Sequence, residues 1–206
     1  MIIYNDEEFW NTLTHFIGLI GSIAGIFFLL YFNSQLPLLS FLGVLLFGFG
    51  LVSVYLSSTL YHYFSEPILK EKLRIFDHIS IYYLIAGSYA PVCLITLLDK
   101  SGLYIFTAVC SIAIFGTLFK LFYTGKYEKL SLALYLLMGW VIIVDIRTLF
   151  EILELNAIIL LVLSGLSYTI GTIFYSRREK YAHTIWHLFV LSGSTFHYFF
   201  VLFYII

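Results

Sequence analysis

The chain is a series of long apolar runs separated by short polar stretches. Seven runs lie at residues 12–32, 38–64, 75–98, 103–122, 130–149, 157–175 and 182–206. Each is close to the roughly 20 residues that a helix needs to cross the hydrocarbon core of a bilayer. The runs lack the strict alternation of membrane β-strands, so we expect helices and not a barrel. The pattern predicts an all-α integral membrane protein with seven transmembrane helices, forming a single domain over residues 1–206.

The composition agrees with this prediction. Hydrophobic residues make up 61% of the chain and charged residues 11%, whereas soluble domains are about 45–50% apolar and about 25% charged. A water-soluble globular domain is therefore excluded. The formal net charge of −1 provides no basic surface for nucleic acid, so no nucleic-acid partner is expected.

The lysine and arginine residues predict an orientation, because cytoplasmic loops carry an excess of them. With seven spans, the N-terminus lies on the same side as the second, fourth and sixth loops. That side carries nine basic residues: Lys70, Lys72, Arg74, Lys120, Lys126, Lys129, Arg177, Arg178 and Lys180. The opposite side carries two, Lys100 and Arg147. We therefore expect a multi-pass protein of the plasma membrane with a cytoplasmic N-terminus and an external C-terminus.

Four ionisable side chains lie inside the predicted spans, near the same membrane face. His62 ends the second span. Asp77 begins the third span, because the polar stretch 65–74 is expected to be a loop, and His183 and His187 begin the seventh. At 1.5 Å per residue, all four would sit ~5–10 Å inside the cytoplasmic boundary. Ionisable groups at such positions are costly and often functional.

The histidines have a spacing that suits a metal ion. His183 and His187 are four residues apart, so they project from one helix face with Cβ atoms ~6 Å apart. Ser58 precedes His62 by the same interval. Three histidines with an open fourth position are typical of a catalytic zinc site, in which Zn²⁺ polarises a carbonyl and activates water. Asp77 could orient a ligand, hydrogen-bond that water or act as a general base.

Each of these residues also has a simpler interpretation. Two histidines spaced like His183 and His187 are more often a pair of interhelical hydrogen-bonding groups than a metal site. The hydroxyl of Ser58 could instead bond to a carbonyl of its own helix. Asp77 could cap the third span or pair with Arg74.

The other three histidines read first as structural residues. His197 would lie ~15 Å deeper in the membrane than His187. At that depth, interior packing with a hydrogen bond is a more common role than metal ligation. His15 and His78 receive the same structural interpretation.

Four segments resemble the haemolysin III family, the bacterial branch of the progestin and adiponectin receptor family. They are EEFWNTLTHFIG at 7–18, SSTLYH at 57–62, FDHISIYYLIAGSYAP at 76–91 and HTIWHLFVLSGSTFH at 183–197. In that family the zinc ligands match His62, His183 and His187. The residues that match Asp77 and Ser58 sit next to the metal and its water. The resemblance thus implies a zinc site with these five residues.

The resemblance leaves the activity open. Receptor-branch relatives are associated with ceramidase-type hydrolysis, so the first hypothesis is a zinc-dependent hydrolase of amide or ester bonds in membrane lipids. The second is a non-enzymatic membrane regulator or receptor in which zinc braces three helices. The third, suggested by the family name, is a pore-forming cytolysin. The scarcity of polar residues in the spans argues against a pore.

Overall fold

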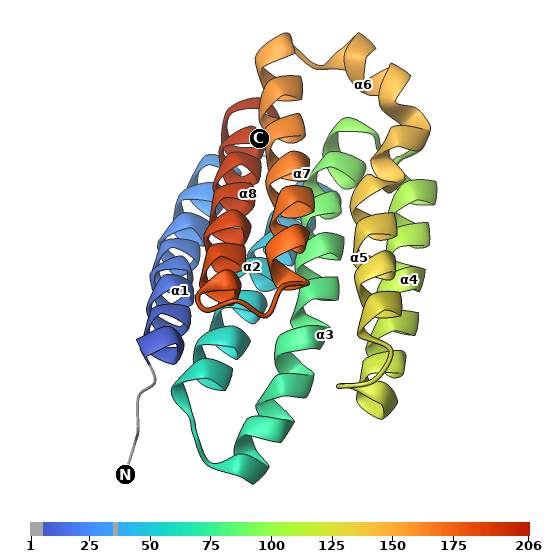
Figure 1. The fold of residues 1–206 in the computed structure, drawn as a ribbon. Coiled ribbons are helices and arrows are strands. Elements are labelled where there is room, and N and C mark those ends of the chain that lie inside the picture. The colour runs from blue at the N-terminus through green and yellow to red at the C-terminus, as the bar shows by residue number, and fades with distance from the viewer. Residues whose placement is uncertain (1–5, 35–36) are drawn as a thin grey trace.

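The computed structural model describes residues 6–34 and 37–206, and within them every regular element is helical (Figure 1). Seven helical segments are long and apolar enough to cross a membrane, which confirms the predicted fold class. The first four are α1 (Asp6–Phe32), α2 (Leu38–Tyr63), α3 (Pro67–Pro91) with its π-helical extension Val92–Thr96, and α4 (Gly102–Tyr123). The fifth span contains α5 (Glu128–Trp140), a 3₁₀ segment (Val141–Asp145) and α6 (Ile146–Ile152). The last two are α7 (Leu155–Tyr175) and α8 (Ala182–Tyr204).

Two helices begin well before the predicted spans. Helix α1 begins at Asp6 and not at residue 12, and α3 begins at Pro67 and not at residue 75. The expected loop 65–74 is thus mostly helix. Pro67 occupies the first helical position, where its missing N–H costs nothing. The carboxylate of Glu66 caps this end by accepting hydrogen bonds from the N–H groups of Ile68 and Leu69, at 3.0 and 2.6 Å.

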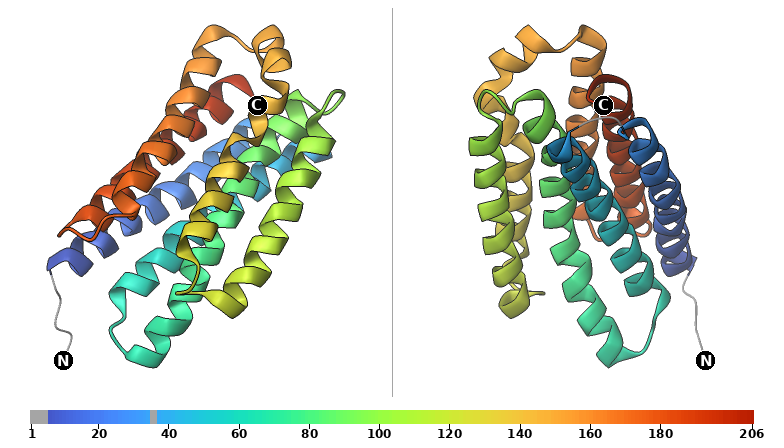
Figure 2. Two further views of the ribbon diagram at one scale, coloured as in Figure 1. Left: turned by 45° about the vertical axis from the view of Figure 1, so that its right-hand side comes forward. Right: turned by 180° about the vertical axis from the view of Figure 1, so that it is seen from behind.

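The helices form a bundle in which α2 packs against α1 and α3, and α8 packs against α1 and α7. Helices α4 and α5 stand to one side, packed mainly on α3 (Figure 2). Close packing of α2 on α3 depends on two glycines. A Cβ atom at Gly50 would lie 2.6 Å from the carbonyl oxygen of Tyr83, and one at Gly87 would lie 2.6 Å from that of Leu46. Small residues at helix contacts are typical of membrane bundles.

The fifth span is interrupted, although the sequence predicts it as one continuous helix. The α-helical pattern ends at Trp140, and the 3₁₀ segment follows. The hydroxyl of Tyr89 lies at this break. It donates to the carbonyl of Met138 at 2.8 Å and accepts from the N–H of Ile142 at 3.0 Å. The tyrosine therefore satisfies backbone groups that the interruption would leave unpaired inside the bilayer.

Candidate metal centre

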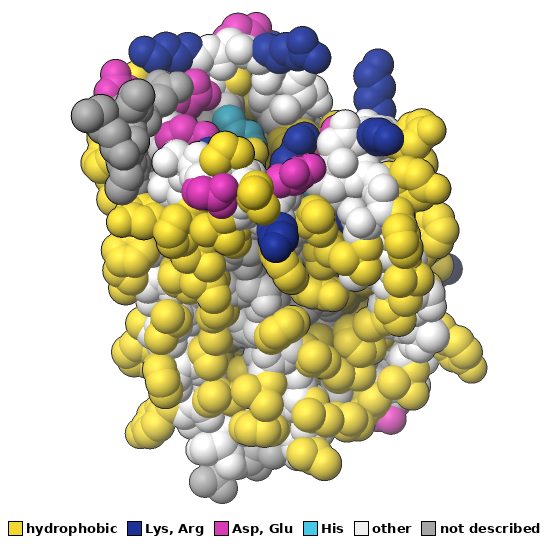
Figure 3. Space-filling model, turned by 90° about the horizontal axis from the view of Figure 1, so that it is seen from below, with side chains coloured by type: hydrophobic (Ala, Val, Ile, Leu, Met, Phe, Trp, Pro, Cys, Tyr) yellow, Lys and Arg dark blue, Asp and Glu magenta, His cyan; other side chains and the backbone are white. Residues whose placement is uncertain are grey.

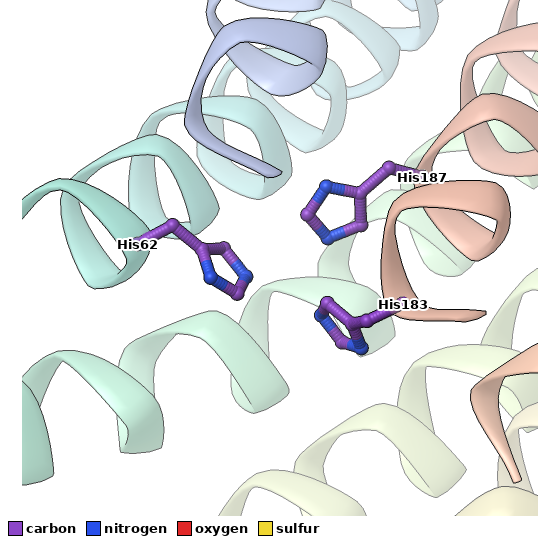
Figure 4. Close-up of side chains that lie close together, drawn as sticks. All are labelled: His62, His183 and His187. Carbon is purple, nitrogen blue, oxygen red and sulfur yellow. The ribbon is translucent and has the colours of Figure 1, made fainter. Parts of the chain in front are cut away.

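Three histidine rings converge at the end of the bundle where α1 begins (Figure 4). His62 lies in the last turn of α2, and His183 and His187 lie in the first two turns of α8. One ring nitrogen from each lies within 4.8 Å of the other two. The predicted convergence of these residues at one depth is therefore seen in the structure. A group of three imidazoles at this separation could hold a metal ion.

The ring of His62 is oriented by a carboxylate. Its Nδ1 lies 2.5 Å from Oε2 of Glu8 in α1, and Oε1 of Glu8 accepts a hydrogen bond from Lys70 at 2.6 Å. The other nitrogen, Nε2, is buried and has no hydrogen-bond partner among the described residues. A carboxylate at Nδ1 favours the tautomer with its proton on that atom, which leaves the Nε2 lone pair free for a metal.

The ring of His187 is held in a similar way by the backbone of α1. Its Nδ1 lies 3.1 Å from the carbonyl oxygen of Asn11 and 3.2 Å from the hydroxyl of Thr14. Donation to the carbonyl would again leave Nε2 available. The side-chain oxygen of Asn11 accepts from the hydroxyl of Thr184 at 2.5 Å. Helix α1 is thereby tied to both helices that carry the histidines.

Ser58 lies one turn from His62 on α2, with its side chain buried. Its hydroxyl has no hydrogen-bond partner among residues 6–34 and 37–206. The alternative in which this hydroxyl bonds to its own helix is therefore not what the structure has. Ser58 instead lines the same cavity as His183 and His187.

Asp77 lies well inside α3 and does not begin that helix, because the expected loop before it is helical. The polar turns before it are helical because Pro67 and Glu66 start the helix earlier. Glu66 supplies the cap, so Asp77 does not. The Oδ2 atom of Asp77 lies 3.4 Å from Nδ1 of His78. Among the described residues Asp77 forms no ion pair with Arg74, whose Nη2 atom instead lies 3.7 Å from Oε1 of Glu128.

The remaining histidines have different surroundings. His197 makes the expected interior hydrogen bond, with Nε2 2.9 Å from the carbonyl oxygen of Ser88. His78 bonds through Nδ1 to the carbonyl of Arg74 at 2.8 Å, as a structural histidine does. His15 is closer to the site than expected, because its ring stacks on that of His187 with centroids 3.6 Å apart and planes 15° apart.

Two spaces meet at the histidine cluster. A polar pocket opens at the end of the bundle, where Figure 3 shows a histidine surrounded by acidic and basic side chains. Its lining consists of Glu7, Glu8, Asn11, Tyr61, His62, Arg74, Asp77, His78, Tyr175 and His183. A longer, mainly apolar cavity extends from His183 and His187 between α3, α5, α7 and α8 as far as Val92 and Ile158. Four residues belong to both linings and stand between the two spaces: Asp77, His78, Tyr175 and His183.

The residues of α1 that hold the histidines were not among the site residues predicted from the sequence. Glu8, Asn11 and His15 follow one another at intervals of three and four residues, so they share one face of α1. A polar stripe on an otherwise apolar helix was the signal that could have revealed them. Lys70 had no comparable signal, because it lies among other charged residues.

Comparison with known proteins establishes the family. The family model described as "Haemolysin-III related" matches residues 3–198. The chain belongs to the haemolysin III family. This family member is 40% identical over 203 residues to the "Hemolysin-3 homolog" of Bacillus subtilis (strain 168), covering 96% of this chain and 94% of the relative. It is 39% identical over 202 residues to the "Hemolysin-3" of Bacillus cereus, covering 97% and 92%.

A human protein is also related to this haemolysin III family member. The "Monocyte to macrophage differentiation factor" of Homo sapiens is 29% identical over 166 residues, which cover 75% of this chain and 66% of that protein. The family resemblance noted from the four motifs is thus confirmed. Together with the seven helices, it identifies an integral multi-pass membrane protein.

Proposed function

We propose that this haemolysin III family member is a membrane-embedded zinc hydrolase that cleaves an amide or ester bond of a membrane lipid. One observation carries the proposal. His62, His183 and His187 converge where a polar pocket meets an apolar cavity. A lipid has the same division, because its polar group and its acyl chain are joined at the bond that a lipid hydrolase cuts.

The residues present fit a zinc ion. Three neutral imidazoles with a fourth position left open are the ligand set of catalytic zinc sites. The buried, unpartnered Nε2 of His62 supports this assignment, since a buried polar atom without a partner costs stability that a bound metal would recover. When bound, zinc would polarise the lipid carbonyl and make water nucleophilic near neutral pH.

The other side chains supply positions for proton transfer and hydrogen bonding. Asp77 borders both spaces, so its carboxylate can take a proton from water that enters by the polar pocket and deliver it to the leaving amine or alcohol. The free hydroxyl of Ser58 can donate to the carbonyl oxygen of the lipid.

The apolar cavity supports an acyl chain as its occupant. Its walls are mostly Leu, Ile, Val and aromatic side chains, which suit an apolar ligand. The nine-to-two distribution of basic residues supports a cytoplasmic position for the polar pocket and an external C-terminus. Water would then reach the histidines from the cytoplasm.

The proposal is tested by measuring zinc content and fatty-acid release on the same purified protein. Wild-type protein should contain about one zinc per chain, since residues 6–34 and 37–206 contain one such cluster. It should also release fatty acid from some members of a panel of lipid amides and esters. Asp77→Asn should keep the zinc and lose turnover by about 10²–10⁴-fold, the usual contribution of a general base. The matched control is Asp99→Asn, an exposed aspartate in the turn after α3, which should behave as wild type.

The outcomes separate the candidate functions. Loss of zinc together with turnover in Asp77→Asn would make Asp77 a ligand, and unchanged turnover would remove it as the base. Zinc without turnover on any lipid would favour a membrane regulator or receptor with a structural zinc, because the cluster also ties α2, α8 and α1 together. The apolar walls of the long cavity lend no support to a pore.

A further inference from the structure

The rings of His15 and His187 lie face to face at the histidine cluster. Their centroids are 3.6 Å apart and their planes differ by 15°. Carbon atoms in contact lie about 3.5 Å or more apart, so this centroid separation leaves the two rings almost no lateral offset. The other stacked ring pairs of the described residues have centroids at least 5.4 Å apart. The two histidines therefore form an unusually close sandwich.

A sandwich of two neutral rings is not the arrangement that aromatic groups prefer. The face of an aromatic ring is negative and its edge is positive, so neutral rings favour an offset or an edge-to-face contact. A positive charge on one ring changes the interaction, because the charge is attracted to the negative face of the other. Two charged rings would repel each other. The geometry thus fits one neutral ring beside one that carries positive charge.

Hydrogen bonds do not account for the position of His15. The side chain is 3% exposed, and neither ring nitrogen has a hydrogen-bond partner in the part of the chain that the structure describes. The ring of Tyr55 in α2 contacts it with centroids 5.1 Å apart and planes at 83°. Gly18 makes room for that tyrosine, because a Cβ atom at this position would lie 2.6 Å from the tyrosine ring. Ring contacts therefore hold His15 where it is.

We propose that His15 is a positioning residue of the metal centre, whose neutral ring stabilises the positive charge that His187 acquires when it holds zinc. The inference rests on the zinc site of the proposed function. The carbonyl of Asn11 already faces Nδ1 of His187, at 3.1 Å, so the metal would bind through Nε2 and make the ring more positive. Burial strengthens the attraction to the face of His15, since such contacts are worth more when water is excluded.

The test measures the zinc affinity of the full-length protein, by competition with a chelating dye, in three variants of one residue. His15→Phe keeps an aromatic face and loses both nitrogens. His15→Leu keeps apolar volume without an aromatic ring, and His15→Gln keeps a hydrogen-bonding group without a ring. His15→Phe should bind zinc nearly as tightly as wild type. The other two should bind on the order of 10-fold more weakly, the equivalent of a buried cation–π contact.

The matched control is His197→Leu, which makes the same change at another buried histidine of the bundle. Its ring contacts Phe47 and Phe200, and its Nε2 lies 2.9 Å from the carbonyl oxygen of Ser88. This variant should lose stability and keep the zinc affinity of wild type.

Thermal unfolding with zinc and with a chelator separates the proposed role of His15 from simple packing. Loss of a packing contact lowers the unfolding temperature equally in both conditions, whereas loss of a charge-dependent contact lowers it more when zinc is bound. His15→Leu should show the second pattern, and equal shifts would overturn the proposal. Wild-type affinity in His15→Leu or His15→Gln, or an equal loss in His15→Phe and His15→Leu, would also overturn it and leave the zinc site intact. Wild-type protein that takes up no zinc would overturn the proposed function, and the role of His15 with it.

Discussion

Glu8 should set the metal affinity of the histidine cluster without contacting the metal. Its Oε2 lies 2.5 Å from Nδ1 of His62, and its Oε1 lies 2.6 Å from the ammonium group of Lys70. The carboxylate thus fixes the orientation and tautomer of the ring, so that the other nitrogen faces the remaining histidines as a metal ligand. Glu8→Gln keeps an oxygen that can accept from the ring but loses the charge. Glu8→Ala removes both the charge and the hydrogen bond.

The structure limits the size of the effect. Loss of such a partner typically weakens metal binding about 10–100-fold, which corresponds to ~1.4–2.7 kcal/mol. The side chain of Glu8 is 32% exposed, so water screens part of its charge. We therefore expect about a 10-fold loss for Glu8→Gln and about a 100-fold loss for Glu8→Ala.

Competition between the purified protein and a chelating dye measures this affinity, and Co²⁺ in place of Zn²⁺ reports the geometry through its visible absorption. Glu71→Gln is the matched control, because it removes the same charge from an exposed position near the beginning of α3. It should bind as tightly as wild type. Unchanged affinity in Glu8→Ala would refute the reasoning. An equal loss in Glu71→Gln would show that the overall charge of this face matters and the contact does not.

Three further predictions concern the metal, the topology and the packing. His187→Ala should lose zinc and stability together, because α2 and α8 lose a common anchor; metal analysis and thermal unfolding measure both, and full occupancy would contradict the assignment. Reporter fusions at Lys126 and Ile206 should report opposite sides of the membrane, and same-side signals would refute the orientation. The side chain of Lys120 is 0% exposed and forms an ion pair with Glu128, which is 31% exposed. Glu128→Gln leaves the buried ammonium group without its counter-charge and should lower the free energy of unfolding by about 3 kcal/mol. Lys120→Met should lower the free energy of unfolding by less than Glu128→Gln does. A Lys120→Met variant that unfolds at a lower temperature than Glu128→Gln would contradict this.

The spans were predictable because the bilayer requires long apolar runs, but their beginnings were not. The first turns of α1 and α3 contain Asp6, Glu7, Glu8 and the charged residues from Lys70 to Arg74. These residues interrupt the apolar pattern, although the helix continues through them. Acidic residues stabilise a helix N-terminus, so their presence marks an extension of the helix as readily as a loop. The break after Trp140 was equally hidden, because the residues around it remain apolar.

The convergence of the histidines was predictable because alternating spans place helix ends at fixed depths. Their ligation of zinc stays a prediction. The contacts of Glu8 with His62 and of His15 with His187 were not predictable, since they depend on how helices rotate about their axes. That rotation is set by packing details such as Gly18 against Tyr55, and a single sequence carries no local signal for it.

The histidine cluster also relates to how the protein is made. His62 lies on the second span to be synthesised, and His183 and His187 lie on the seventh, so a nascent chain lacks the complete cluster until Ala182–Tyr204 has entered the bilayer. The contact of Glu8 with His62 needs only the first two spans and can form earlier. Metal uptake would then mark complete insertion. Chains stalled on the ribosome before α8 should retain no metal, and full-length chains should acquire it.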